Sequence, residues 1–165
     1  MISRTLKRQK LTIKKINYSK INYSKMNDFN HLSLNSLSIV FSFLEGNEIL
    51  EIKTISKDYK CFFPIHPRTL KQMKDFNLLE KIEQFHNIIL SGPLGYFDFM
   101  NIQKNAKLIV TDSGGIQEES TYFGVQCLTV RENTERPITI TEGTNILIGN
   151  TIGNISKEIK NILEN

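Results

Sequence analysis

The stretch TDSGGIQEES, residues 111–120, follows the apolar run LIV at 108–110 and decides how the chain is interpreted. The apolar run predicts a buried strand, and residues 116–123 are compatible with a helix. Between them, Gly114 and Gly115 permit backbone angles denied to other residues and let a ligand approach the main chain closely. The free N–H groups and the dipole at a helix start favour an anion such as phosphate. We therefore predict a strand, turn and helix with an anion site at the turn, although a purely structural turn is the alternative.

Similar short apolar runs recur along the chain and alternate with helix-compatible segments. Further strands are expected at 59–65, 88–90, 127–130 and 145–148, and further helices near 34–44, 48–57, 70–76, 97–105 and 155–163. Short buried strands that alternate with helices form βαβ units around a parallel sheet. We predict an α/β fold, a Rossmann-like parallel sheet with helices on both faces.

Charge divides the chain into two parts. The 165 residues suffice for one domain with a core, and 39% of them are hydrophobic. Eight of the 21 Lys and Arg residues lie within residues 1–25, which contain no acid, so residues 26–165 carry 13 basic and 17 acidic residues. We predict a basic, disordered leader over 1–30 and a Rossmann-like lobe over 31–165. A basic tail can contact nucleic acid or an anionic surface, but we favour a solvated leader without a specific ligand, and a nucleic-acid partner is not expected.

The remaining composition excludes several classes of protein. No apolar stretch approaches the ~20 residues of a membrane-spanning helix, so no membrane association is expected. No apolar segment follows the basic N-terminus in signal-peptide order. Cys61 and Cys127 are far apart without a CxxC partner, as is typical of reduced, packed thiols. We expect a cytoplasmic protein, and we expect neither a metal nor a cofactor.

Two adjacent acids follow the glycine turn. Glu118 and Glu119 point about 100° apart on a helix, so that one can face the strand-end cleft while the other faces solvent. A carboxylate beside a phosphate is repulsive unless it binds something else, and paired ribose hydroxyls are a suitable donor. The alternative for Glu118 is a solvated first-turn acid that the helix dipole favours.

Two arginines follow the strand expected at 127–130. Arg131 and Arg136 should lie at the same sheet edge as the glycine turn, where a guanidinium matches phosphate oxygens bidentately. The alternative for Arg136 is a surface ion pair with Glu132 or Glu135.

Five motifs occur in order along the chain: PIHPRT (64–69), GPLGYFDFM (92–100), TDSGGIQEES (111–120), RENTERP (131–137) and GTNILIG (143–149). Together they resemble the C-terminal half of the non-hydrolysing UDP-N-acetylglucosamine 2-epimerases, over about residues 58–165. The resemblance implies one lobe of the two-lobed glycosyltransferase-B architecture, which binds nucleotide sugar between two Rossmann-like lobes. It also implies interconversion of UDP-GlcNAc and UDP-ManNAc by elimination and re-addition of UDP.

The resemblance further implies roles for individual residues in binding UDP or UDP-GlcNAc. Ser113 and Gly114 would hold the diphosphate, and Glu119 would bind the ribose hydroxyls. Arg136 would balance the phosphate charge and help UDP to leave. Phe99 would lie against the uracil.

The PIHPRT segment is implied to reach a second, regulatory UDP-GlcNAc site or the cleft itself. His66 and Arg68 are its candidate residues. A histidine that is hydrogen-bonded at a strand end is the alternative for His66.

The family's catalytic carboxylates lie on the N-terminal lobe, and the HRxEN motif that begins its C-terminal lobe has no match in this sequence. We therefore expect the chain to supply the UDP-binding lobe, to contain no catalytic residue, and to need a separately encoded N-terminal lobe or a homodimer partner. The alternative is a non-catalytic UDP-sugar-binding remnant or regulatory fragment. A glycosyltransferase of the same architecture fits SGGIQEE and TERP less well.

Overall fold

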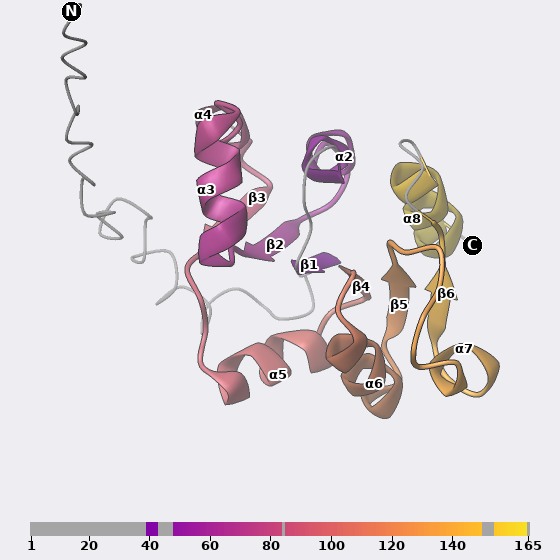
Figure 1. Ribbon diagram of the computed structural model, residues 1–165. Coiled ribbons are helices and arrows are strands. Elements are labelled where there is room, and N and C mark those ends of the chain that lie inside the picture. The colour runs from indigo at the N-terminus through magenta and orange to yellow at the C-terminus, as the bar shows by residue number, and fades with distance from the viewer. Residues whose placement is uncertain (1–38, 43–47, 84, 150–153, 165) are drawn as a thin grey trace, which may run out of the picture.

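The computed structural model describes residues 39–42, 48–83, 85–149 and 154–164 (Figure 1). The strands are β1 (Ile39–Ser42), β2 (Cys61–Pro64), β3 (Ile88–Ser91), β4 (Leu108–Thr111), β5 (Gln126–Thr129) and β6 (Asn145–Leu147). The helices between and after them are α2 (Glu48–Ile55), α3 (Pro67–Asp75), α4 (Leu79–Glu83), α5 (Tyr96–Lys104), α6 (Gly114–Phe123), α7 (Ile138–Thr141) and α8 (Asn154–Glu164).

The strands form one sheet in the order β3-β2-β1-β4-β5-β6, and every neighbouring pair is parallel. The chain moves outward in one direction from β1 to β3 and in the other from β4 to β6, so the order reverses between β1 and β4. Ser42 pairs with Thr111, which in turn pairs with Thr129, so β1, β4 and β5 end at one edge of the sheet. In open α/β sheets, ligands bind outside the carboxyl ends of the strands at such a reversal.

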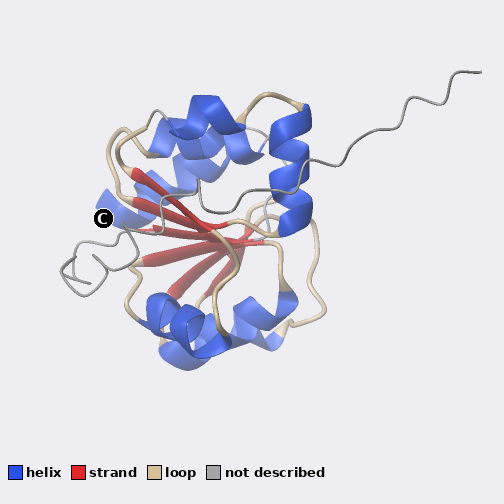
Figure 2. Ribbon diagram, turned by 90° about the vertical axis from the view of Figure 1, so that its left-hand side faces the viewer, coloured by secondary structure: helices blue, strands red, loops and turns tan. Residues whose placement is uncertain are grey.

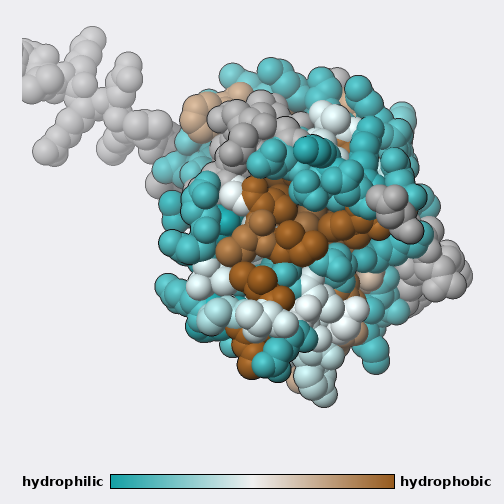
Figure 3. Space-filling view, turned by 90° about the vertical axis from the view of Figure 1, so that its right-hand side faces the viewer, coloured by the Kyte–Doolittle hydropathy of each residue, from teal (hydrophilic) through white to brown (hydrophobic). Residues whose placement is uncertain are grey.

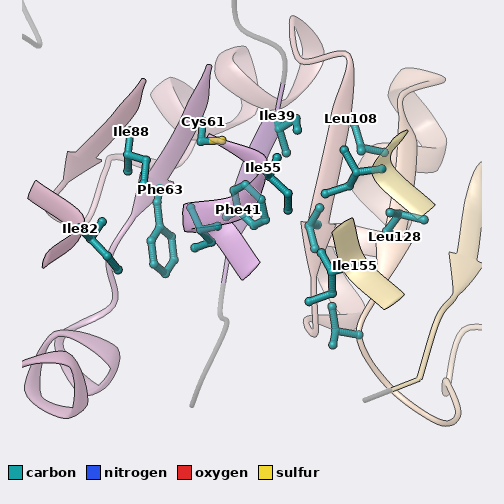
Figure 4. Close-up of a cluster of buried hydrophobic side chains, with 14 of the residues drawn as sticks. Ile39, Phe41, Ile55, Cys61, Phe63, Ile82, Ile88, Leu108, Leu128 and Ile155 are labelled. Carbon is teal, nitrogen blue, oxygen red and sulfur yellow. The ribbon is translucent and has the colours of Figure 1, made fainter. Parts of the chain in front are cut away.

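Helices cover both faces of the sheet, as Figure 2 shows. Side chains of successive strand residues point to opposite faces. In β1, Ile39 and Phe41 join the larger apolar cluster with α2, α3 and α8 (Figure 4). Val40 joins the smaller cluster with α5 and α6. Burial of β1 on both faces explains its continuous apolar sequence. The predicted fold class, a Rossmann-like parallel sheet with helices on both faces, is confirmed.

One predicted helix is wrong over the part of it that the structure describes. Residues 34–44 were expected to be helical, but Ile39–Ser42 is a central strand that pairs with β2 and β4. A short, fully buried apolar run looks the same in a helix and in a strand, and here pairing on both sides decides. Two short helices, α4 and α7, were not predicted, and the sequence ITIT of α7 is rich in residues that favour strands. The predicted leader at 1–30 lies outside the described residues.

The β6 side of the molecule exposes apolar side chains, as Figure 3 shows. Ile138 and Ile140 of α7 and Ile146 of β6 are exposed. None of the helices in the part of the chain that the structure describes is long and apolar enough to cross a membrane.

Candidate functional site

A pocket of about 400 Å³ lies at the carboxyl ends of the strands. Its lining comes from three segments that follow β2, β4 and β5, namely His66, Arg68, Thr69, Asp112, Ser113, Gly114 and Arg131. Since β1 lies between β2 and β4, the pocket spans the point at which the strand order reverses. This is the position and the size range expected for a small-molecule site.

The turn between β4 and α6 forms one wall of the pocket. The Ser113 N–H donates to Oγ1 of Thr111 at 3.0 Å, and Ser113 is the N-cap residue of α6. Its side chain makes no capping hydrogen bond, so the hydroxyl is available to a ligand. The free N–H groups of the first turn of α6, which begins at Gly114, make this wall suited to an anion.

The two glycines of the turn do not adopt the backbone angles that the sequence suggested. Among the described residues, Gly124 and Gly149 are the glycines with positive φ, and neither Gly114 nor Gly115 belongs to that group. A Cβ at Gly114 would meet its nearest neighbour, Cγ of Arg136, at 3.9 Å, and a Cβ at Gly115 would meet nothing within 4 Å. The protein's own packing therefore does not require glycine at either position. Close approach of a ligand at Gly114 stays a prediction.

His66 and Arg68 line the pocket from the start of α3. His66 is the N-cap residue, and its Nδ1 accepts a hydrogen bond from the Arg68 N–H at 3.3 Å. The alternative foreseen for His66, a hydrogen bond at a strand end, is therefore present, and the ring also lines the pocket. With Nδ1 as the acceptor, a neutral ring carries its proton on Nε2 and can donate from there.

Arg136 lies beside the pocket and does not line it. Its Cγ is next to Gly114, and its Nε forms an ion pair with Oε1 of Glu118 at 2.9 Å. Its Nη1 also donates to the backbone carbonyl of Glu135 at 3.2 Å. The ion-pair partner of Arg136 is thus Glu118, whereas the sequence suggested Glu132 or Glu135.

Glu119 and Phe99 lie outside the pocket lining. Glu119 accepts a hydrogen bond at 2.6 Å from Nε2 of Gln103, a fully buried residue of α5. Phe99, also on α5, is half-buried against the smaller apolar cluster. The structure therefore brings His66, Arg68, Ser113 and Gly114 into one pocket and leaves Glu119 and Phe99 on the helices behind it.

Three lining residues were not among the predicted site residues. Arg131 was expected at this sheet edge as a guanidinium that matches phosphate but was given no role as a site residue, and Thr69 and Asp112 were not singled out. Thr69 and Asp112 belong to the motifs PIHPRT and TDSGGIQEES, so membership of a strand-end motif was the signal that pointed to them.

Neither of the two cysteines belongs to the pocket lining. Burial raises the pKa of the Cys61 thiol to about 12 and also raises the pKa of Cys127, so both stay protonated near neutral pH. Within the described ranges, no group of three or more His, Cys, Asp and Glu side chains is arranged to hold a metal ion.

A family model described as UDP-N-acetylglucosamine 2-epimerase matches residues 46–165. This chain belongs to the UDP-N-acetylglucosamine 2-epimerase family. The resemblance carried by the five sequence motifs is thereby confirmed, and the match extends toward the N-terminus as far as α2.

Relatives in this epimerase family are considerably longer than this chain. The UDP-N-acetylglucosamine 2-epimerase of Methanococcus maripaludis is 46% identical over 118 residues, which cover 70% of this chain and 32% of the relative. The enzyme of the same description from Escherichia coli K12 is 34% identical over 116 residues, which cover 70% of this chain and 30% of the relative. The chain thus spans about a third of the length of these relatives.

Solved epimerase structures share the fold. The UDP-GlcNAc 2-epimerase of Methanocaldococcus jannaschii, in complex with UDP-GlcNAc and UDP, matches with a TM-score of 0.70 and 33% identity, over 89% of this chain and 45% of that one. The Neisseria meningitidis enzyme bound to UDP-GlcNAc matches with a TM-score of 0.73 and 28% identity, over 88% and 42% respectively. The chain corresponds to one lobe of the two-lobed glycosyltransferase-B architecture.

Proposed function

We propose that the chain binds UDP or UDP-GlcNAc and forms the UDP-binding lobe of a UDP-N-acetylglucosamine 2-epimerase. The observation that supports this most directly is the pocket at the reversal of strand order, where the start of α6 faces a lining that contains two guanidinium groups. The M. jannaschii structure with the same fold contains UDP-GlcNAc and UDP.

The charges of the pocket suit a diphosphate. Arg68 and Arg131 each supply a permanent positive charge, and Asp112 is the single carboxylate of the lining. The amide groups at the start of α6 and the Ser113 hydroxyl add donors from the segment after β4, which lies between β2 and β5 in the sheet. Charge-assisted bonds of this kind are about twice as strong as neutral ones.

In this proposal, Glu119 binds the ribose hydroxyls. Its Oε2 is held by Gln103, and within the described part of the chain its Oε1 accepts no hydrogen bond. A rise of 1.5 Å per residue places Glu119 about 7 Å along α6 from Gly114, so the ribose would lie along the helix from the diphosphate. Phe99, on the neighbouring helix α5, would contact the uracil, and Arg136 would balance phosphate charge next to Gly114.

We assign binding, and no catalytic group, to the described lobe. Epimerisation at C2 of the sugar needs acid and base groups within hydrogen-bond reach of the reacting carbon. In our proposal these groups come from an N-terminal lobe, supplied by a separate chain or by a partner subunit. The chain aligns with about a third of its relatives' length, which leaves ample length in those relatives for a second lobe.

The two cysteines support a cytoplasmic location for this function. Cys61 in β2 and Cys127 in β5 are separated by β1 and β4, so at about 4.8 Å per strand they lie roughly 14 Å apart. This distance is too long for a disulfide bond. Both thiols are free and buried, as is common in a reducing compartment.

Calorimetric titration of the purified chain with UDP tests the proposal. We expect heat of binding with UDP and much weaker binding of uridine, which lacks the phosphates. The Lys157→Ala variant removes one exposed charge on α8 and should bind UDP as the wild type does. Absence of any UDP binding would overturn the proposed function.

A further inference from the structure

A buried polar network connects α6 to the loop that carries Arg136. We propose that this network positions the Arg136 guanidinium beside the start of α6, where it meets the phosphate of a bound nucleotide. The inference rests on the proposed function and adds positioning residues to it. The members of the network come from α6, the loop after β5, α7, β5 and β6, and they are Gln117, Thr134, Thr139, Thr129 and Asn145.

Thr134 is the link between the helix and the loop. Its hydroxyl donates to Oε1 of Gln117 at 2.5 Å and accepts a hydrogen bond from the Arg136 N–H at 3.0 Å. A single side chain thus ties the backbone of Arg136 to the second turn of the helix whose first turn faces the pocket. These two hydrogen bonds fix the position of the Arg136 backbone N–H relative to α6.

The carbonyl side of Arg136 is tied in the same way. The Thr139 hydroxyl donates to the Arg136 carbonyl at 2.7 Å, and Thr139 accepts a hydrogen bond from Nδ2 of Asn145 at 3.0 Å. The same Nδ2 donates to Oε1 of Gln117 at 3.2 Å, which closes the connection back to α6. Oδ1 of Asn145 accepts from the hydroxyl of Thr129 at 2.6 Å, which anchors the network in β5.

The side chains of this network are polar but almost completely buried, and packing alone does not explain their burial. Gln117 and Thr129 are 0% exposed, Thr139 is 1% exposed and Asn145 is 3% exposed. Burial of polar groups costs free energy unless every group is hydrogen-bonded, and Nε2 of Gln117 has no partner. Apolar side chains would fill the same volume without this cost. The network therefore indicates a need for a defined geometry at Arg136.

Preorganisation of Arg136 for ligand binding explains that need. An arginine that is already fixed beside the phosphate site loses less conformational freedom when the ligand binds. On the side-chain end, Nε lies 2.9 Å from Oε1 of Glu118 in an ion pair that lacks hydrogen-bond alignment, and Glu118 belongs to the same helix as Gln117. Contacts with α6 thus position both the backbone and the guanidinium of Arg136.

Removal of the Thr134 hydroxyl tests the inference. In the full chain, Thr134→Val should weaken UDP binding by roughly fivefold, the scale of one lost hydrogen bond. Thr134→Ser keeps the hydroxyl and should bind as the wild type does. Weak uridine binding, measured by NMR titration, should not change. In an Arg136→Ala background, Thr134→Val should have no further effect, because the hydroxyl acts through Arg136.

Each other outcome contradicts the inference. Wild-type UDP affinity in Thr134→Val, an equal loss for UDP and uridine, or a full additional loss in the Arg136→Ala background would each show that the network only supports the fold. Thr134→Ala provides a second hydroxyl-free variant if valine disturbs folding, which circular dichroism would reveal. A wild-type chain that does not bind UDP overturns the proposed function and the positioning role together, whereas the three outcomes above contradict only the positioning role, because the wild-type chain still binds UDP.

Discussion

Arg136 and Glu118 are joined by an ion pair in which Nε lies 2.9 Å from Oε1. The neighbouring acid, Glu119, turns the other way and accepts a hydrogen bond from Gln103. The two adjacent acids of the QEE sequence therefore have different partners on different sides of α6. Because both side chains of the ion pair are substantially exposed, at 40% and 54%, the pair contributes little to folding stability, and its effect is on the orientation of the guanidinium.

Loss of either side chain proposed to contact UDP should weaken binding. We expect Arg136→Ala and Glu119→Ala each to lower UDP affinity by roughly 1–3 kcal/mol, the scale of charge-assisted hydrogen bonds. Calorimetric titration measures the change, with Lys157→Ala as the matched control for a lost charge. Unchanged affinity in both variants would exclude these roles.

Alanine substitutions at Gly114 and Gly115 should distinguish an effect on UDP binding from an effect on folding stability. A Cβ at Gly114 has room in the unliganded protein, so Gly114→Ala should not lower the free energy of unfolding, and the helix propensity of alanine favours a small gain of up to about 1 kcal/mol. A ligand against the backbone at Gly114 would meet the new methyl group, which should weaken UDP binding by roughly 1–3 kcal/mol. Urea unfolding and calorimetry measure the two effects. Gly115→Ala, at a position outside the pocket lining, is the control and should affect binding less.

Gly143 should behave in the opposite way, as a purely structural glycine. A Cβ at this position would lie 2.4 Å from the Thr139 carbonyl oxygen and 2.6 Å from Oγ1 of Thr121, so the turn after α7 would have to shift away from the backbone of α7 and from the Thr121 side chain. We expect Gly143→Ala to lower the free energy of unfolding by about 1–3 kcal/mol, measured by urea denaturation. A stability equal to that of the wild type would show that this contact relaxes freely.

The Cys61 thiol should make stability depend on alkaline pH. Burial raises its pKa to about 12 in the folded chain, above the ordinary value of 9.0, so the folded state retains a proton that the unfolded state loses. The contribution of the protonated Cys61 thiol to the free energy of unfolding is fully present below pH 9 and is lost as pH rises from about 9 toward 12. Urea unfolding of the wild type and Cys61→Ala across this range should show a steeper decline for the wild type. Parallel curves would contradict the assignment.

Residues 1–165 by themselves should not interconvert UDP-GlcNAc and UDP-ManNAc, because the acid and base groups are assigned to another lobe. An assay of the two nucleotide sugars should show no turnover with this chain and turnover after addition of a complementary N-terminal lobe. Turnover by the chain alone would mean that the described lobe contains catalytic groups. UDP binding without turnover under any combination would favour the binding-only alternative.

The sequence predicted most of the secondary structure because its local pattern is strong. Short apolar runs at 59–65, 88–90, 108–110 and 127–130 alternate with helix-compatible segments, and this alternation alone predicts a parallel sheet. It also placed the TDSGG turn after a strand, and hence at the edge where ligands bind. It could not distinguish β1 from a helix, because a run of three buried apolar residues, Ile39–Phe41, has no diagnostic period.

The linear sequence determined which chemical groups stand at the ends of the strands, since each group follows its strand directly along the chain. The tertiary structure alone decided which of those groups meet. Arg68, Ser113 and Arg131 share a pocket because β2, β4 and β5 end at one edge of the sheet, and Asn145 reaches Gln117 because β6 lies beside β5. Such contacts between distant residues depend on strand order and on packing, and no local pattern in the sequence contains that information.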